Sequence, residues 1–154
     1  MRVFILNGPP GIGKDTLAMH IQQLLGFPTM AFKTALYVET ARHYDLPLHI
    51  VFNLCNVRLY KEVPTDLFWG DSPRSALIHV SENLIKPNFG KKFFGLKAHE
   101  EILKLAGVTG SVVFADGGFV EEVECLVEHG HEVHIVQMHG YGFDFKNDSR
   151  TYIN

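Results

Sequence analysis

The stretch GPPGIGKDT, residues 8–16, decides the fold of this chain. An apolar run, Val3 to Leu6, precedes it and a segment with helical periodicity follows it, so the sequence predicts a strand, a loop and a helix. The glycines allow backbone N–H groups to turn inward around phosphate oxygens, the helix directs its positive end at them, and Lys14 adds a full charge. Polyphosphate is the ligand that suits such a cradle. The residues expected to bind it are Gly8, Pro9, Pro10, Gly11, Ile12, Gly13, Lys14, Asp15 and Thr16.

Two other interpretations of this stretch are weaker. The dinucleotide motif G-x-G-x-x-G requires a third glycine, but Gly11 and Gly13 are followed by Lys14, Asp15 and Thr16. NAD and FAD are therefore disfavoured. A plain Gly/Pro turn between a strand and a helix remains the alternative without a ligand.

The hydroxyl residue of this stretch, Thr16, lies one position further from the lysine than in the usual phosphate loop. In the usual phosphate loop, the residue that ligates magnesium directly follows the lysine, whereas here Asp15 takes that position and Thr16 comes next. Thr16 is therefore expected to hold Mg²⁺ either directly or through water. Asp15 is either a group in the outer shell of the metal or a negative charge that favours the helix N-terminus.

Length and composition indicate a globular protein. With 154 residues, 46% of them hydrophobic and 20% charged, the chain is long enough for one proper core, and we expect one domain spanning 1–154. Cys55 and Cys125 lie far apart in apolar surroundings, which favours two reduced core thiols. No basic leader precedes the first strand and no apolar run approaches a membrane span, so we expect a cytoplasmic protein without a membrane partner.

Periodicity and helix breakers predict an α/β fold with a parallel sheet flanked by helices. The expected strands are residues 2–7, 29–32, 111–115 and 132–138, and the expected helices are 14–25, a segment ending at Tyr44, 48–56, 72–87, a segment carrying Phe94, Ala98, Ile102 and Leu105, and 120–127. Residues 58–71 read as irregular, and residues 88–91 as a turn. Ligands bind at the carboxyl ends of parallel strands, so residues 8–16 and Asp116 are expected at the same edge.

Asp116 ends the apolar run from Ser111 to Ala115, which is typical of a strand buried on both faces. An acid in that place beside a phosphate loop is suited to hold magnesium or its waters, and magnesium bridges the phosphates during transfer. The alternative is that Asp116 caps the helix that begins near Phe119.

A basic cluster and several histidines come outside these motifs. The cluster consists of Lys86, Lys91, Lys92 and Lys97, interleaved with Phe89, Phe93 and Phe94. It is either a solvated face or a contact to the phosphates of an acceptor. The net charge of −3 argues against nucleic-acid binding over a large surface but not against a local contact. The histidines near the last strand, His129, His131, His134 and His139, favour lone imidazoles over a metal site.

The phosphate loop resembles that of one family of kinases. G-x-x-G-x-G-K-x-T is the pattern of nucleoside monophosphate kinases, and Gly13-Lys14-Asp15-Thr16 is similar to the deoxynucleoside monophosphate kinases of bacteriophages. Ser72-Pro73-Arg74-Ser75-Ala76-Leu77 is similar to the segment in which those enzymes carry an arginine at the acceptor site. The resemblance implies a P-loop NTPase fold (Walker A loop) with ATP and Mg²⁺ bound. Gly117-Gly118 departs from it, because those kinases often place an arginine there.

The resemblance also bears on the tail and on the acceptor. Residues 143–152 occupy the place of a lid, so Arg150 is expected to reach developing phosphate charge, unless the terminus is frayed. The lid is abbreviated, which suits an acceptor held elsewhere, and the chain resembles the small 5-hydroxymethyldeoxyuridine DNA kinases of phages. That branch implies phosphorylation of a hydroxymethyl group on a base in viral DNA, in the host cytoplasm, with Arg58, Lys61, Arg74 and the lysines from 86 to 97 touching the DNA. The alternatives are a kinase of free deoxynucleoside monophosphates and a nucleotide-binding module without catalysis. No obligate protein partner is evident.

The expected catalytic residues are Lys14, Asp15, Asp116, Arg74 and Arg150. Lys14 and the loop amides bind the β- and γ-phosphates, Thr16 and Asp116 hold magnesium, and an arginine meets the migrating phosphoryl group. An alcohol acceptor needs a general base, for which Asp15 and Asp116 are the candidates, whereas a phosphate acceptor needs none.

Overall fold

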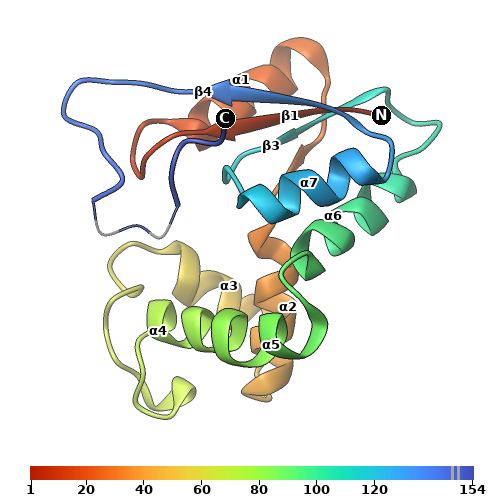
Figure 1. Ribbon diagram of the computed structural model, residues 1–154. Coiled ribbons are helices and arrows are strands. Elements are labelled where there is room, and N and C mark those ends of the chain that lie inside the picture. Colours follow the sequence, from red (N-terminus) through yellow and green to blue (C-terminus); the bar gives the residue numbers. More distant parts are fainter. Residues whose placement is uncertain (147, 149) are drawn as a thin grey trace. The chain divides into compact units, whose positions relative to one another are not determined.

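The computed structural model describes residues 1–146, 148 and 150–154 (Figure 1). The chain divides into two compact units. One consists of Met1–Phe32 and Phe94–Asn154 and contains the sheet, and the other, Lys33–Phe93, contains only helices and irregular segments. We call them the sheet unit and the helical unit and describe each by itself. The expectation of a single domain stays a prediction, since compactness does not show whether either unit folds alone.

The sheet unit is built on four parallel strands. β1 (Arg2–Asn7), β2 (Thr29–Met30), β3 (Ser111–Phe114) and β4 (Glu132–Gln137) lie in the order β2-β3-β1-β4. Val3 in β1 is level with Val112 in β3 and with Val133 in β4. The chain places β2 and β3 on one side of β1 and β4 on the other, so the strand order reverses at β1. In open parallel sheets, ligands bind at such a reversal, outside the carboxyl ends of the strands.

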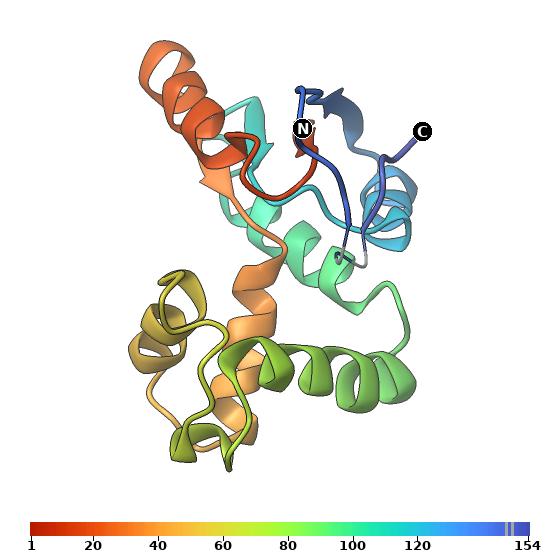
Figure 2. The same cartoon turned by 90° about the vertical axis from the view of Figure 1, so that its left-hand side faces the viewer.

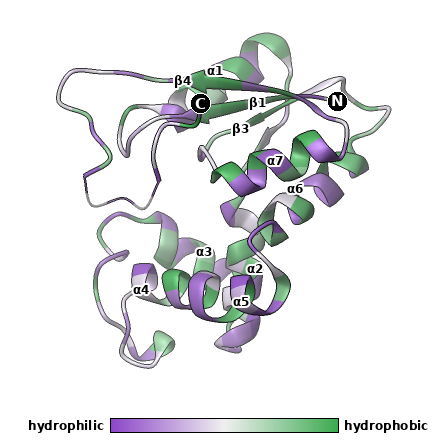
Figure 3. Ribbon diagram, viewed as in Figure 1, coloured by the Kyte–Doolittle hydropathy of each residue, from purple (hydrophilic) through white to green (hydrophobic). Residues whose placement is uncertain are grey.

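Helices cover both faces of this sheet. In Figures 1 and 2, α1 (Lys14–Leu25) lies on one face, and α6 (Phe93–Lys104) and α7 (Val120–Glu128) lie on the other. In Figure 3 strands β1 and β3 are mostly hydrophobic, whereas the helices alternate, as expected when only one side of each helix meets the sheet. The prediction of an α/β fold with a parallel sheet flanked by helices is confirmed.

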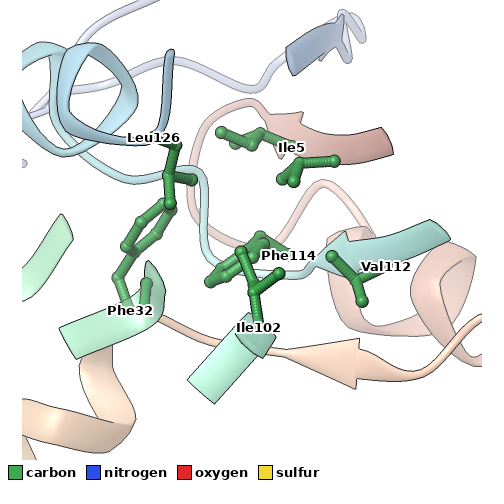
Figure 4. Packing of buried hydrophobic residues seen from close by; sticks show 8 residues of the cluster. Ile5, Phe32, Ile102, Val112, Phe114 and Leu126 are labelled. Atoms are coloured by element: carbon green, nitrogen blue, oxygen red, sulfur yellow. The ribbon is translucent and has the colours of Figure 1, made fainter. Parts of the chain in front are cut away.

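Alternate residues of β1 and β3 supply the two cores. Beneath α6 and α7, the buried cluster comprises Val3, Ile5, Phe32, Ala98, Ile102, Val112, Phe114 and Leu126 (Figure 4). Beneath α1, it comprises Leu6, Ala18, Val113 and Ala115. Every residue of β3 is buried, as the continuous apolar run predicted. Strand β4 is an edge strand and alternates between exposed and half-buried residues.

The helical unit contains α2 (Lys33–His43), α3 (Leu48–Asn56), a 3₁₀ turn η1 (Asp66–Phe68), α4 (Pro73–Ile78), a π-helix η2 (His79–Ile85) and α5 (Lys86–Phe89). Its core includes Tyr37, Tyr44, Val51, Cys55, Phe68, Ala76 and Val80. Cys55 and Cys125 are both buried thiols that are not joined in a disulfide, as expected.

Most boundaries lie within two residues of the expectation, and one helix end differs for a clear physical reason. The helix that begins at Pro73 was expected to end at Pro87, but it continues through the π-helix η2 and α5 to Phe89. In an α-helix the ring of a proline clashes with the carbonyl four residues earlier. Here the preceding turns are wider, since the N–H of Lys86 bonds to the carbonyl of Ser81, five residues back. The helix therefore passes the proline, and the expected turn at 88–91 starts only after Phe89.

Among the helices that the structure describes, none has the length and apolar character needed to cross a membrane.

Candidate functional site: the glycine loop and the tail of the sheet unit

The predicted phosphate loop lies between β1 and α1. Gly11 has a φ of 80° and Gly13 a φ of 99°, values that strain any residue with a Cβ. Gly13 is also the N-cap of α1, whose first helical hydrogen bond joins the N–H of Leu17 to the Gly13 carbonyl at 2.9 Å. The amides of Lys14, Asp15 and Thr16 precede that bond, so they have no carbonyl partner within the helix. Such amides at the positive end of a helix are suited to bind an anion.

The side chain of Lys14 lies back across this loop. Its Nζ donates to the carbonyl of Gly8 at 2.6 Å and to that of Pro9 at 2.9 Å. Burial lowers the pKa of Lys14, and the positive charge of Arg150 lowers it further, while Asp15, Asp148 and Asp116 act in the opposite direction. A cation in partly desolvated surroundings is stabilised by an added anion, so the electrostatics favour a phosphate beside Lys14.

The glycines of the loop have different physical roles. A Cβ on Gly8 would lie 2.9 Å from the carbonyl oxygen of Met138 and 3.1 Å from the side chain of Ile12, so Gly8 is required by close packing against the end of β4. A Cβ on Gly13 would meet no atom within 4 Å, so Gly13 is required by its backbone angle and has open space around it. Asp15 and Thr16 are exposed on the first turn of α1.

Asp116 follows β3 and is 9% exposed. One oxygen of its carboxylate, Oδ1, accepts from the N–H of Phe32 at 3.1 Å. The alternative expectation, that Asp116 caps α7, is wrong: Phe119 is the N-cap residue, and its N–H donates to Glu122 at 2.7 Å. The sheet unit thus places Asp116 at the edge where sequence analysis expected it.

Gly117 and Gly118 have φ angles of 77° and 60°. A Cβ on Gly118 would lie 2.8 Å from the ring of Phe32. A side chain at this position is therefore excluded by backbone strain and by packing. An arginine at Gly118 would therefore not fit this backbone and this packing.

Magnesium is the metal that the donors suggest. A carboxylate, a hydroxyl and water are the hard oxygen ligands that Mg²⁺ takes, commonly with only one or two protein groups and the phosphates of the substrate. Asp116 already accepts a backbone hydrogen bond through Oδ1, which fits a metal held through water. In the described part of the chain, no group of three or more His, Cys, Asp or Glu side chains is arranged to hold a metal by itself. The donor set therefore fits a magnesium ion that arrives with a polyphosphate.

Arg150 is held firmly in this unit by two partners. Its Nε and Nη2 donate to Oδ1 and Oδ2 of Asp148 at 2.9 and 2.8 Å, and its Nη1 donates to the carbonyl of Asp116 at 2.7 Å. The Asp148 side chain is only 8% exposed and that of Arg150 29%. The hydrogen bonds that Arg150 donates to the Asp148 carboxylate raise the pKa of Arg150. The alternative of a frayed terminus is therefore wrong for Arg150, which lies beside Asp116 and close enough to Lys14 to perturb it.

The last residues of the chain form a strap across the ends of β1 and β4. Asn7, at the end of β1 and 1% exposed, accepts from the N–H of Ile153 at 2.9 Å and donates to the carbonyl of Thr151 at 3.3 Å. Gln137 donates to the carbonyl of Ile153 at 2.9 Å, and the Tyr152 hydroxyl donates to that of Met138 at 2.9 Å. The strap fixes the chain immediately after Arg150.

Sequence analysis missed Asn7 and Asp148. The signal for Asn7 was a polar residue that ends an apolar strand and directly precedes the glycine loop. Asp148 offered only an acid two positions from an arginine, a spacing that occurs often in exposed loops. Asn147 and Ser149, which belong to the expected lid, lie outside the described residues.

Arg74 belongs to the helical unit, at the start of α4. Ser72 caps α4 by accepting from the N–H of Ser75, and Pro73 takes the first helical position, as predicted. The Nε of Arg74 pairs with Glu62 on the surface of this unit. The structure thus brings Lys14, Asp116 and Arg150 together in the sheet unit, while the role of Arg74 stays a prediction.

The other expected DNA contacts are divided between the units. Arg58, Lys61, Lys86, Lys91 and Lys92 belong to the helical unit, and Lys97 belongs to α6 of the sheet unit. Lys86 pairs with Glu82, and Lys97 pairs with Glu100. These ion pairs are compatible with both interpretations of the lysine cluster, a solvated face and a contact to the phosphates of an acceptor.

Two histidines that were expected to be isolated contact another histidine. His99 of α6 and His131 share a hydrogen bond of 2.9 Å between ring nitrogens, and the ring of His129 lies 4.2 Å from that of His99. Burial lowers the pKa of both His99 and His131. The expectation of lone imidazoles is wrong for His129 and His131, because the fold brings His99 to them from a distant segment.

Comparisons of the sequence with protein-family models and with curated proteins found no match.

Proposed function

We propose that the chain is a P-loop kinase that transfers the γ-phosphoryl group of ATP to a hydroxyl group of a deoxynucleotide-type acceptor. The observation that carries this proposal is the convergence of two cations and a carboxylate on the glycine loop. Lys14 crosses the loop, Arg150 donates to the Asp116 carbonyl, and the Asp116 carboxylate follows the neighbouring strand. A binding site for polyphosphate alone does not need a carboxylate near the phosphates, whereas phosphoryl transfer with magnesium does.

The residues divide the work of transfer between them. The amides that open α1 and the ammonium group of Lys14 bind the β- and γ-phosphates of ATP. Thr16 and Asp116 would hold Mg²⁺, directly or through water, and the bound ion would supply positive charge that neutralises the phosphates. The guanidinium group of Arg150, preorganised by Asp148, stabilises the charge that develops on the transferred group. Positioning and electrostatics account for most of the catalysis, since transfer demands little covalent help from the protein.

For the acceptor we favour the hydroxymethyl group of 5-hydroxymethyldeoxyuridine within DNA. The described tail after Arg150 is tied to β1 and β4 as a strap, which supports an acceptor that is not enclosed by a long lid. Residues 33–93 contain eight Lys and Arg against six Asp and Glu, a net charge of +2, so the remaining residues carry −5. The positive helical unit supports a polyanionic acceptor such as DNA.

The base for an alcohol acceptor is Asp15 rather than Asp116 in this proposal. The Asp116 carboxylate is buried and accepts from the Phe32 N–H, while Asp15 is exposed on the first turn of α1. A free deoxynucleoside monophosphate is the second candidate acceptor, since the same loop serves it and its phosphate needs no base. A nucleotide-binding module without transfer is the third candidate.

The test supplies ATP labelled in the γ-phosphate together with DNA that contains 5-hydroxymethyluracil, and in parallel with the four deoxynucleoside monophosphates. We expect label in the DNA only. Lys14→Met is expected to reduce transfer by at least about 100-fold, because it removes one phosphate-bound charge from a partly desolvated site. Lys104→Met is the control, since Lys104 is an exposed residue of α6 paired with Glu101.

Asp15→Asn separates the acceptors. Transfer to an alcohol is expected to fall by about 100-fold or more, and transfer to a monophosphate is expected to change little. Label in the monophosphates alone would overturn the DNA acceptor, and label in neither pool would leave the binding module as the better account. An unchanged rate for Asp15→Asn on DNA would remove Asp15 as the base.

A further inference from the structure

Asn7 is a buried polar residue that the proposed mechanism leaves without a role. It is the last residue of β1, directly before Gly8, and it is only 1% exposed. Burial of an amide side chain costs free energy unless hydrogen bonds satisfy it. An amide at the end of an apolar strand therefore calls for a physical reason.

The two hydrogen bonds that the structure gives this side chain both go to the strap, residues 151–154. Its Oδ1 accepts from the N–H of Ile153 at 2.9 Å, and its Nδ2 donates to the carbonyl of Thr151 at 3.3 Å. Ile153 is 5% exposed, so Asn7 supplies the acceptor that a buried amide needs. The strap is thus tied to the residue that precedes the glycine loop.

The same side chain lies close to the segment that follows β3. A Cβ on Gly117 would lie 3.5 Å from Nδ2 of Asn7 and 3.2 Å from the carbonyl oxygen of Leu6. Gly117 directly follows Asp116, whose carbonyl accepts from Nη1 of Arg150 at 2.7 Å. Asn7 therefore lies where three segments meet, namely the start of the glycine loop, the residues after β3, and the strap.

Arg150 is held from both sides in the sequence. Asp148 binds its guanidinium group, and Thr151, the next residue, is held by Asn7. The positive charge of Arg150 lies close enough to Lys14 to lower the pKa of Lys14. Neighbouring cations repel each other, and an anion bound beside both relieves that repulsion. A polyphosphate in the glycine loop is therefore expected to favour the state in which Arg150 is held.

We propose that Asn7 is a positioning residue for Arg150: by holding the strap, it keeps the guanidinium group beside the phosphates that the glycine loop binds. The proposal rests on the proposed function, because it gives Asn7 a part in holding the polyphosphate of that site. Coupling between two sites is reciprocal, so a polyphosphate in the glycine loop also holds the strap in place.

The experiment measures how often Arg150 leaves its position. Trypsin cuts the bond between Arg150 and Thr151 only after the guanidinium group has left Asp148 and the strap has opened, so the rate of this cut follows the population of the open state. The full chain is treated with trypsin, and peptides that end at Arg150 are quantified over time by mass spectrometry. The cut after Lys104, an exposed residue of α6, is the internal reference for global unfolding and for effects on the protease.

Variants of the tie come first. Asn7→Ala is expected to raise the rate of the cut at Arg150 by roughly 5- to 100-fold, because the buried amide of Ile153 loses its acceptor. Thermal unfolding shows whether this variant is folded. Ser111→Ala is the matched control, since Ser111 is 1% exposed in β3 and its hydroxyl has no partner among the described residues. Its cut at Arg150 is expected to match that of the wild type.

A second variant loosens the strap without altering β1. Tyr152→Phe removes the hydrogen bond of 2.9 Å from the Tyr152 hydroxyl to the Met138 carbonyl. We expect a smaller increase in the cut at Arg150 than for Asn7→Ala, because the freed carbonyl belongs to a residue that solvent partly reaches.

Inorganic triphosphate tests whether the held Arg150 faces phosphates bound by the loop. Its binding is measured by calorimetry with Mg²⁺ present, and the trypsin experiment is repeated at a saturating concentration. In the wild type, the cut at Arg150 is expected to slow by roughly 5- to 150-fold, the usual range of coupling between two sites. Lys14→Met is expected to show little slowing at the same concentration, because it lacks one of the charges that bind phosphate.

The affinity for triphosphate separates positioning from a purely structural tie. Asn7→Ala is expected to weaken it by about 2- to 5-fold, because the state with Arg150 in place is populated less. In an Arg150→Ala background, Asn7→Ala is expected to have no further effect. Equal weakening in both backgrounds would mean that Asn7 acts on the loop directly, and an unchanged affinity would leave Asn7 as a structural tie; either result overturns the proposal.

The outcomes separate this proposal from the kinase proposal. Slowing of the cut by triphosphate together with a faster cut in Asn7→Ala supports positioning by Asn7 even if no acceptor takes label from ATP. An unchanged cut in folded Asn7→Ala overturns it even if phosphoryl transfer proceeds. Triphosphate that binds to the wild type without slowing the cut also overturns it, because Arg150 would then not face the bound phosphates. Failure of triphosphate to bind at all would overturn both proposals.

Discussion

Replacing Asp148 by asparagine tests whether Arg150 acts because Asp148 holds it. In the proposed mechanism, Asp148 is a positioning residue that touches neither nucleotide nor acceptor. We expect the asparagine variant to fold, because its side chain has almost the same shape, and to lose phosphoryl transfer through a lower kcat. The KM for ATP is expected to change much less, because Lys14 and the loop amides bind the nucleotide in the ground state.

The magnitude follows from the contacts of the pair. The two oxygens of Asp148 accept from Nε and Nη2 of Arg150 at 2.9 and 2.8 Å, and its side chain is 8% exposed. Asparagine retains one oxygen but turns an N–H₂ group toward a guanidinium donor, so one charge-assisted hydrogen bond is lost. Such a bond contributes about 1.5–3 kcal/mol. If this free energy is expressed in the transition state, kcat falls by roughly 10- to 150-fold. The bond from Nη1 to the Asp116 carbonyl remains, which favours the lower end.

A double-mutant cycle makes the test decisive. The rate of transfer to the acceptor that takes label is measured for wild type, Asp148→Asn, Arg150→Ala and the double variant, and thermal unfolding is followed in parallel. If Asp148 acts through Arg150, it has no further effect on kcat once Arg150 is alanine. Asp144→Asn is the control, because Asp144 is exposed in the same tail. The reasoning is refuted if the two single effects multiply, or if Arg150→Ala transfers phosphate as fast as wild type.

Two further predictions concern the stability of the sheet unit. Gly95→Ala is expected to lower the free energy of unfolding by about 1–3 kcal/mol, because a Cβ there would lie 2.8 Å from the Glu122 carbonyl of α7. Denaturant unfolding compares this variant with Gly110→Ala, because a Cβ on Gly110 would meet nothing within 4 Å. Equal losses of stability in the two variants would contradict the packing argument. The lowered pKa values of His99 and His131 mean that the folded protein binds fewer protons than the unfolded chain near and below pH 6.5, so stability is expected to fall as the pH is lowered from 7 to 5. The melting temperature of His99→Asn is expected to depend less on pH between 7 and 5 than that of the wild type. An unchanged pH dependence would show that this histidine pair is not the cause.

The elements that sequence analysis predicted well depend on local chemistry. Helix α1 has Gly13 as its N-cap and Gly26 as its C-cap, both with positive φ, because glycine adopts these angles at little cost. Strand β3 was predicted from four apolar residues in succession, and all of them are buried. The cap at Ser72 was likewise a local feature, since its partner is three residues away.

Predictions were incomplete where the partners of a residue lie far along the chain. Asp116 was predicted as an acid at the right edge, but its hydrogen bond to the Phe32 N–H spans 84 residues. Asn7 was not selected at all, because its bond to Ile153 spans 146 residues. No pattern within a few residues distinguishes such a polar group from an ordinary one.

The sequence by itself determined the glycine loop, its strand and helix, and the presence of an acid after the second long buried strand, because φ angles and hydrophobic period are properties of neighbouring residues. Only the tertiary structure decided that β1 lies between β3 and β4, that Asp148 binds Arg150 beside Asp116, and that Asn7 forms hydrogen bonds with the strap. These features depend on contacts that form after the sheet has assembled, when burial makes each polar group of the strap take a partner.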